Sequence, residues 1–257
     1  MEKNQIKYLT PLCKMMDEIK EFYEKTKFQI NQEIRDVDNF KPPINWIKIF
    51  FKIYPRMKRI NLERPTSWGE FLNLLKRRKS IREFKDSPIL LSSLTNILHY
   101  SVGIKNPEDS LKDTKRYYPS AGARYPIETY ILNNNIQELE RGLYHYNVKY
   151  EQLEQLLKED LRTISTEIFG EANKGNPNFI VFTGVISRTE VKYGINAYRF
   201  ALLEAGHIGQ NVYLLAEKEG LGCCGLGGFD NDRLCKLLDI YEDEIPLYAF
   251  SLGEPAE

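Results

Sequence analysis

Residues 189–230 read TEVKYGINAYRFALLEAGHIGQNVYLLAEKEGLGCCGLGGFD, and the rest of the chain can be understood around this stretch. The apolar side chains of its first part recur at the spacing of one helix face: Phe200, Leu203, Ile208, Val212 and Leu215. This spacing predicts one long helix, and Gly220 is the expected stop signal. Small residues at 201, 205, 206 and 209 would let another backbone or a flat ligand come close to the helix.

The tail of the stretch, residues 221–229, consists mostly of glycine and cysteine. Such a segment has too little side chain to fill a core, and it leaves backbone N–H groups free to face another group. We therefore expect the amides of this tail to serve a function.

The composition of the whole chain excludes several classes of function. Its 257 residues are enough for one large domain or two small ones, with 42% hydrophobic residues to supply a core. Lys plus Arg and Asp plus Glu both number 36, and the resulting zero net charge argues against nucleic-acid or anionic-membrane binding through bulk charge. No apolar run could cross a membrane and no secretory signal is present, so we expect a cytoplasmic protein.

The cysteines and histidines do not have the spacing of a zinc site. Cys13, Cys223, Cys224 and Cys235 form no Cys-x-x-Cys pair, and the three histidines lie near no other candidate ligand in the sequence. We expect no metal site, and we interpret the cysteines as small apolar residues in a reducing compartment.

A basic cluster follows a predicted helix at residues 68–77. Its alternation would put Arg78, Ser80 and Arg82 on one face of an extended segment, with Ile81 on the other. Two guanidinium groups beside a hydroxyl suit a phosphate or a polar ring. Taken alone, the cluster could equally be a surface loop after a helix.

A second loop is shaped by two prolines. Residues 117–126 read YYPSAGARYP, so Pro119 and Pro126 stiffen its ends while the small residues Ser120, Ala121 and Gly122 could lie flat against a ring.

The remaining pattern mixes helices and strands without the regular alternation of a parallel doubly wound sheet. Further helices are predicted at residues 8–36, 91–100, 151–157 and 231–238, and strands at 127–132, 142–147, 179–186 and 247–252. No Gly-x-Gly-x-x-Gly follows a strand, which argues against a Rossmann site. The aromatic segment from Trp46 to Pro55 could be a membrane-surface helix, but its length and final proline favour an extended arm packed on the core or on a partner subunit.

Three features in this order resemble the FMN-dependent nitroreductase superfamily: residues 78–82, residues 119–122, and the glycine-rich tail that ends at Asp230. Four local phrases are similar to its SagB-type, thiazole/oxazole-forming dehydrogenase branch: residues 22–27, 117–124, 142–146 and 199–211. The resemblance covers nearly the whole chain.

The resemblance implies an α+β fold, with a mainly antiparallel sheet flanked by helices and an obligate homodimer that holds FMN at its interface. It divides the chain into an N-terminal helix and arm at residues 1–66 and an FMN-binding domain at residues 67–257.

The resemblance also assigns residues to the flavin. Arg78 and Ser80, with Lys79 between them, would bind its phosphate and ribityl end, and Arg82 would lie near the pyrimidine edge. Pro119, Ser120, Ala121 and Gly122 would cover the ring from the other subunit. Gly227, with Leu226 and Gly228 beside it, would offer a backbone N–H to flavin N5.

Lys192 and Tyr193 match a Lys-Tyr pair implicated in catalysis in the dehydrogenase branch. Oxidation of an azoline to an azole removes a proton from carbon, so a base must lie close to that carbon, and either side chain could serve. The alternative is an ordinary helix N-terminus with one exposed residue and one packed residue.

One feature departs from the family pattern. Residues 251–257 contain no Lys or Arg where many relatives bind the phosphate, which leaves Arg78 with Arg199 or Arg124 as candidates.

Three functions therefore stand at this point. The first is a dehydrogenase that acts on a heterocycle in a peptide or carrier-bound substrate, within a multi-enzyme synthetase. The second is an NAD(P)H-dependent reductase of nitroaromatics, quinones or enamides, and the third is a non-catalytic partner subunit.

Overall fold

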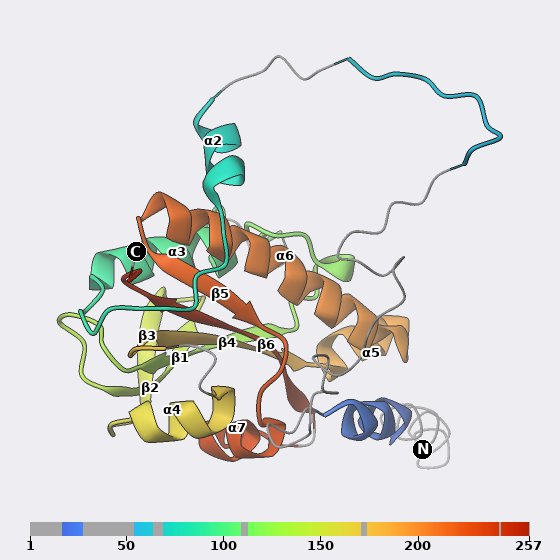
Figure 1. Cartoon of the computed structure of the whole chain (residues 1–257). Coiled ribbons are helices and arrows are strands. Elements are labelled where there is room, and N and C mark those ends of the chain that lie inside the picture. The colour runs from blue at the N-terminus through green and yellow to red at the C-terminus, as the bar shows by residue number, and fades with distance from the viewer. Residues whose placement is uncertain are drawn as a thin grey trace, which may run out of the picture.

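The protein is built on a six-stranded sheet in which every strand pairing is antiparallel, in the order β3-β2-β1-β4-β6-β5 (Figure 1). This computed structural model describes residues 17–27, 54–63, 69–108, 113–170, 174–241 and 243–256. The strands are β1 (Ile127–Asn133), β2 (Gly142–Asn147), β3 (Gln152–Leu157), β4 (Asn178–Val185), β5 (Gly222–Leu226) and β6 (Glu244–Gly253). The predicted α+β class, a mainly antiparallel sheet flanked by helices, is confirmed.

Helices cover both faces of this sheet. In Figure 1, α3 (Leu91–Val102) and α6 (Asn196–Lys218) lie above it, while α4 (Arg162–Phe169) and α7 (Asn231–Leu238) lie below it. The short α5 (Ser187–Tyr193) precedes α6, and α2 (Glu70–Arg77) stands at the upper edge. Residues 17–26 form a further helix, and residues 121–123 form a single 3₁₀ turn.

The central strand β4 shows why the sheet is covered on both sides. Ile180 and Phe182 point to the core under α3 and α6, whereas Phe179 and Val181 point to the core over α4 and α7. Because side chains alternate along a strand, a strand buried on both faces is apolar throughout. The strand NFIVFTGV fits this rule, with seven of its eight residues buried.

The long helix α6 packs its small residues against the sheet. Its buried stripe includes Ala201, Ala205, Ile208 and Gly209. A Cβ on Gly209 would lie 2.6 Å from the ring of Phe250, so only glycine allows this approach of helix to strand. Ala201, Ala205 and Gly209 therefore face the protein's own sheet, whereas Gly206 is exposed, and the larger Leu202 and Leu203 are 42% and 54% exposed.

Three sequence predictions of local structure are wrong. The helix expected to run on from residue 189 is broken at Gly194, whose φ of 56° ends α5. Residues 151–157, predicted as a helix, form β3, because the turn at 148–151 returns the chain along β2 and Asn147 caps that turn through its side-chain oxygen. Part of the glycine-rich tail is the strand β5, so its backbone is paired with β6 rather than free.

The N-terminal predictions are only partly testable. The spacing of apolar residues in the helix predicted at 8–36 makes Met15, Ile19, Phe22, Tyr23 and Phe28 its candidate buried positions. Ile19 and Tyr23 are buried, Phe22 is 54% exposed, and Met15 and Phe28 lie outside the described residues. The aromatic segment predicted from Trp46 to Pro55 also lies outside them except for Tyr54 and Pro55, which are exposed. The helix predicted at 68–77 is α2, and none of its residues is buried.

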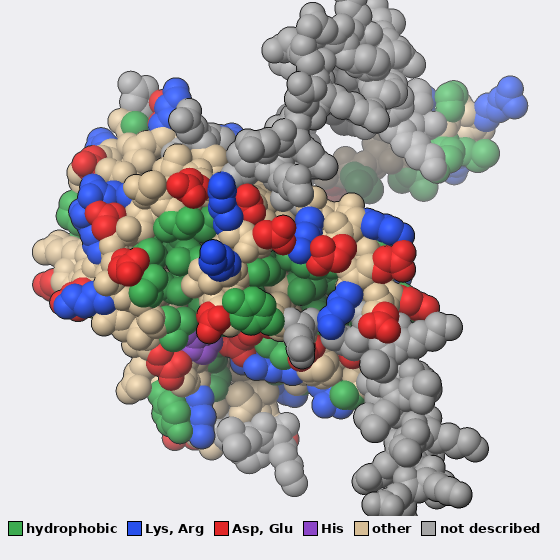
Figure 2. All heavy atoms as spheres, turned by 90° about the horizontal axis from the view of Figure 1, so that it is seen from below, with side chains coloured by type: hydrophobic (Ala, Val, Ile, Leu, Met, Phe, Trp, Pro, Cys, Tyr) green, Lys and Arg blue, Asp and Glu red, His purple; other side chains and the backbone are tan. Residues whose placement is uncertain are grey.

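Charged side chains of both signs are interspersed over the face seen from below, around a hydrophobic centre (Figure 2). Among the described residues, no helix is long and apolar enough to span a membrane.

Candidate functional site

The loop before β1 has an unusual backbone. Gly122, Ala123 and Tyr125 have φ values of 62°, 51° and 48°, which place three residues of one turn in the left-handed region. For residues other than glycine this conformation is unfavourable and persists only where surrounding contacts impose it. Here the Ser120 hydroxyl oxygen accepts a hydrogen bond from the Tyr125 N–H at 2.8 Å, which closes the turn.

A buried carboxyl on α6 holds this loop. Glu204 Oε1 accepts hydrogen bonds from the Ser120 hydroxyl at 2.8 Å and from the Ala121 N–H at 3.0 Å. Burial raises the pKa of Glu204, although both hydrogen bonds and the charge of Arg116 act in the opposite direction. Sequence reasoning missed Glu204; the signal was an acid on the apolar face defined by Ala201 and Ile208.

The predicted pair Lys192 and Tyr193 lies against the tip of the same loop. A Cβ on Gly122 would lie 2.8 Å from Tyr193 Oη and 3.2 Å from Lys192 Nζ. The Tyr193 ring is held edge-on by Phe200, with 4.9 Å between ring centroids. The fold therefore brings together the residues at 119–122 and 192–193, which are about seventy positions apart in the sequence.

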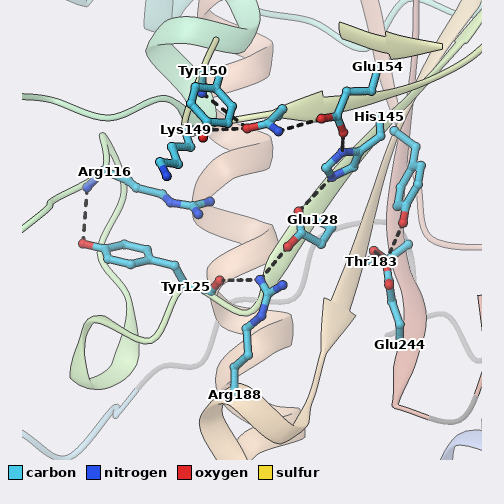
Figure 3. Close-up of polar contacts among 12 residues, drawn as sticks. Arg116, Tyr125, Glu128, His145, Lys149, Tyr150, Glu154, Thr183, Arg188 and Glu244 are labelled. Carbon is cyan, nitrogen blue, oxygen red and sulfur yellow. Dashed lines mark hydrogen bonds and ion pairs between the residues drawn. The ribbon is translucent and has the colours of Figure 1, made fainter. Parts of the chain in front are cut away.

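The helix that carries this pair is tied to the sheet by a charged network (Figure 3). Arg188 on α5 donates to the Tyr125 carbonyl at 3.4 Å and forms an ion pair of 2.5 Å with Glu128 on β1. His145 on β2 lies between the carboxylates of Glu128 and Glu154, at 3.0 Å and 2.9 Å. Arg188 thus joins α5 both to the end of the loop, at Tyr125, and to the sheet, at Glu128.

The basic cluster lies elsewhere, against the C-terminal half of α6. Ser80 Oγ is 3.0 Å from Tyr213 Oη, and the Arg78 guanidinium lies over the Tyr213 ring at 5.1 Å. The Ile81 N–H donates to the Cys223 carbonyl at 2.9 Å, which fixes the segment along β5. Lys79 and Arg82 are exposed. Tyr213, which also accepts from the Gly225 N–H at 2.7 Å, had no signal in the sequence.

The predicted backbone donors follow directly on β5. Leu226 is its last residue and pairs with Ala249 of β6. Gly227 and Gly228 lie beyond the strand, and a Cβ on Gly227 would meet no atom within 4 Å, so the space in front of this backbone is open.

The predicted site residues therefore form two groups within one chain. The loop group contains residues 119–122 with Lys192 and Tyr193, and the strand group contains residues 78–82 with 226–228. Glu204 and Tyr213, their contacts on α6, are nine residues apart, or about 13 Å along the helix.

Two cavities lie beside the helix at residues 17–26. One of about 370 Å³ lies between the helix at 17–26 and the start of α6, and Phe22, Ile195 and Arg199 line it. A larger one, about 890 Å³, lies between that helix, α7 and β6, and none of its lining residues belongs to the predicted site. Within the described ranges, no cluster of His, Cys, Asp or Glu could hold a metal ion.

Comparison with known proteins identifies the family. The sequence model described as the nitroreductase family matches residues 75–254. The chain belongs to the nitroreductase family. This is a family of oxidoreductases, and the match covers both groups of predicted site residues.

Two relatives are similar to this chain in sequence. It is 31% identical over 190 residues to the provisionally named nitroreductase MJ1384 of Methanocaldococcus jannaschii, covering 72% of this chain and 91% of that protein. It is 29% identical over 148 residues to the microcin B17-processing protein McbC of Escherichia coli, covering 54% of each chain. The match thus spans about half the length of McbC.

A solved structure has the same fold over almost the whole chain. A chain of the E. coli microcin synthetase McbBCD complex with truncated pro-MccB17 bound superimposes with a TM-score of 0.70 at 20% identity, covering 95% of this chain and 94% of that one.

Proposed function

We propose that this nitroreductase-family oxidoreductase is an FMN-dependent dehydrogenase that oxidises an azoline-type heterocycle to an azole in a peptide natural product. The observation that carries the proposal is the contact between the Gly122 loop and the Lys192–Tyr193 pair. Lys192 is exposed and Tyr193 is half-buried against Phe200, as the alternative of an ordinary helix terminus also predicts, but that alternative does not account for a glycine tip beside both polar atoms.

The residues of the strand group fit FMN. Arg78 and Ser80 present a cation and a hydroxyl beside Tyr213, which suits a phosphate and a polyol chain. The open space before Gly227 would admit a flat ring to the backbone. Bound FMN would supply the hydride acceptor at its N5 position.

The loop group would handle the proton. Oxidation of an azoline breaks two C–H bonds: one hydrogen leaves as hydride to the flavin and the other as a proton. Tyr193 as phenolate, or Lys192 as amine, would accept the proton. The absence of a side chain at Gly122 lets the loop tip lie directly against both polar atoms.

A complete site would need two copies of the chain. The loop and strand groups contact α6 at Glu204 and Tyr213, nine residues or about 13 Å apart along the helix. We propose that the strand group of one copy holds the flavin and the loop group of the other copy covers it. The outward face of α6 and the unburied α2 expose apolar side chains that a second copy would cover: Leu202, Leu203, Phe71 and Leu75. We therefore propose a homodimer with residues 119–122 reaching the partner's flavin.

The similarity to the microcin B17-processing protein McbC supports a peptide substrate. We propose that this substrate is bound within a multi-enzyme synthetase. A substrate tethered to a carrier protein would satisfy the same chemistry. A second candidate is an NAD(P)H-dependent reductase of nitro, quinone or enamide compounds, and the similarity to MJ1384 favours it.

Purified protein tests the proposal in two steps. It should carry, or take up, FMN and show the visible absorption band of oxidised flavin. With oxygen as acceptor it should then convert an azoline-containing peptide to a product two hydrogens lighter by mass spectrometry. NAD(P)H-driven reduction of a nitroaromatic without azoline oxidation would favour the reductase, and failure to bind FMN would indicate a non-catalytic subunit.

A further inference from the structure

Glu204 is a buried acid with a specific pair of contacts outside its own helix. It is 3% exposed, and it lies among the small and apolar residues that pack α6 on the sheet. One oxygen, Oε1, accepts both hydrogen bonds from the loop, at 2.8 Å and 3.0 Å. Within the described part of the chain, the other oxygen, Oε2, is buried without a partner. Packing alone does not explain an acid here, because an apolar residue would avoid the cost of its burial.

The two bonds fix a loop that is otherwise unfavourable. Ser120 links Glu204 to the end of the turn, because its hydroxyl donates to Glu204 and accepts from the Tyr125 N–H. Tyr125 is itself bonded to Ser120, and Ala123 lies between the two; their φ values are positive, 48° and 51°. Without the carboxyl, Ser120 and the Ala121 N–H would lose their acceptor, and the turn would lose the contacts that over-determine it.

The tip of the turn has little freedom. Gly122 follows Ala121 directly, and its Cβ position lies 2.8 Å from Tyr193 Oη. A shift of the turn by an ångström would either press on Lys192 and Tyr193 or open a gap beside them. Misplacements of this size can cost about a hundredfold in rate.

We propose that Glu204 is a positioning residue: by holding Ser120 and Ala121 it fixes Gly122 against Lys192 and Tyr193 and so sets the geometry of the proton-accepting pair. The expected effect on turnover rests on the proposed function, whereas the effect on the loop does not.

Two substitutions separate geometry from charge. Glu204→Gln keeps an oxygen that can accept both hydrogen bonds, and it resembles the neutral form that burial favours. Glu204→Ala removes the acceptor. Glu244→Ala is the matched control, because Glu244 Oε1 also accepts two hydrogen bonds, from Tyr130 and Thr183, and neither partner belongs to the loop.

The first readout is amide hydrogen exchange in the protein without flavin. In Glu204→Ala the amides of Ala121 and Tyr125 should exchange about tenfold faster or more, while Glu204→Gln and Glu244→Ala leave both protected. Unchanged exchange at these two amides in Glu204→Ala would overturn the proposal, whatever the enzyme does.

The second readout is steady-state oxidation by the FMN-loaded protein. Glu204→Ala should lower kcat about tenfold or more with a smaller change in KM, and Glu204→Gln should restore kcat to within about threefold of the wild type. A loosened loop with unchanged kcat, or a Gln variant as slow as the Ala variant, would contradict a positioning role. A wild type that oxidises no azoline would remove the proposed reaction and leave the exchange result to decide the role of Glu204 in the loop.

Discussion

At the scale of single residues, Gly122 combines two constraints. Its φ of 62° disfavours any side chain, and the space where a Cβ would go is filled by Tyr193 Oη and Lys192 Nζ. Gly122→Ala should therefore displace the pair and lower azoline oxidation about tenfold or more, with FMN still bound. Steady-state kinetics and equilibrium dialysis of the flavin measure the two effects.

A matched glycine separates steric contact from backbone strain. Gly220 has a similar φ of 74°, but a Cβ there would meet nothing within 4 Å. Gly220→Ala should introduce the same kind of backbone strain as Gly122→Ala, at a cost of order 1 kcal/mol in the free energy of unfolding. It should leave turnover unchanged. Equal losses of turnover in both variants would show that strain, rather than contact with Lys192 and Tyr193, explains the effect of Gly122→Ala.

At the scale of elements, α5 depends on the charged network that joins it to β1, β2 and β3. The hydrogen bond to Glu128 is the main cause that raises the pKa of His145, followed by the bond to Glu154 and against the effect of burial. Burial would raise the pKa of Glu128, but its bonds to His145 and Arg188 outweigh this and lower it. The network is therefore strongest with a protonated imidazole and ionised carboxylates.

The pH dependence of the protein's stability follows from the raised pKa of His145 and the lowered pKa of Glu128. The raised pKa of His145 stabilises the fold fully below the unfolded value, about 6.5, and the contribution is lost as pH rises through the folded pKa. The lowered pKa of Glu128 stabilises it above the unfolded value, about 4.3, and is lost as pH falls. His145→Gln should thus lower the melting temperature more at about pH 5.5 than at about pH 8.5.

A double variant checks that Glu128 is the partner responsible. In a Glu128→Gln background, most of the pH dependence of the His145→Gln effect should disappear. If the effect of His145→Gln is the same at both pH values in the wild-type background, the network does not contribute in this way.

The same scale shows what the sequence could predict. Strands β1 and β2 and helix α7 were predictable because their patterns match a single period and end at turn residues. Residues 151–157 were not, because Leu153, Leu156 and Leu157 together satisfy a helical spacing rather than an alternating one, and only pairing with β2 makes the segment a strand. Gly194 ends α5 within an otherwise helical pattern, and α4 was not predicted at all.

The candidate site was predictable as a set of segments but not as an arrangement. The order of residues 78–82, 119–122 and 226–228 suggested a flavin family. The contact of Gly122 with Tyr193, and the anchoring of two segments by Glu204 and Tyr213, depend on α6 crossing the sheet between them. Such long-range packing leaves no periodic signal in the sequence.

At the scale of the whole molecule, the proposed flavin site would be completed by a second copy of the chain. Leu203 on the outward face of α6 is 54% exposed, and in a homodimer it would be buried. Leu203→Glu should therefore give a monomer in analytical ultracentrifugation and weaken FMN retention about tenfold or more, because a desolvated, unpaired carboxylate opposes association.

Leu156 offers the matched control. It is 50% exposed on β3, at the opposite edge of the sheet from β5. Leu156→Glu should leave both the dimer and its flavin intact. A Leu203→Glu protein that stays dimeric would place the interface elsewhere, and a monomer that keeps FMN at wild-type affinity would show that one chain completes the site.

In the proposed reaction, Tyr193 or Lys192 removes a proton from the substrate as the flavin is reduced. Anaerobic stopped-flow mixing of FMN-loaded protein with an azoline-containing peptide tests it most directly, because the visible flavin band reports reduction before any reoxidation. We predict rapid bleaching in the wild type and bleaching slowed about a hundredfold or more in Lys192→Ala or Tyr193→Phe, with FMN still bound in both. Bleaching at the wild-type rate in both variants would contradict the account.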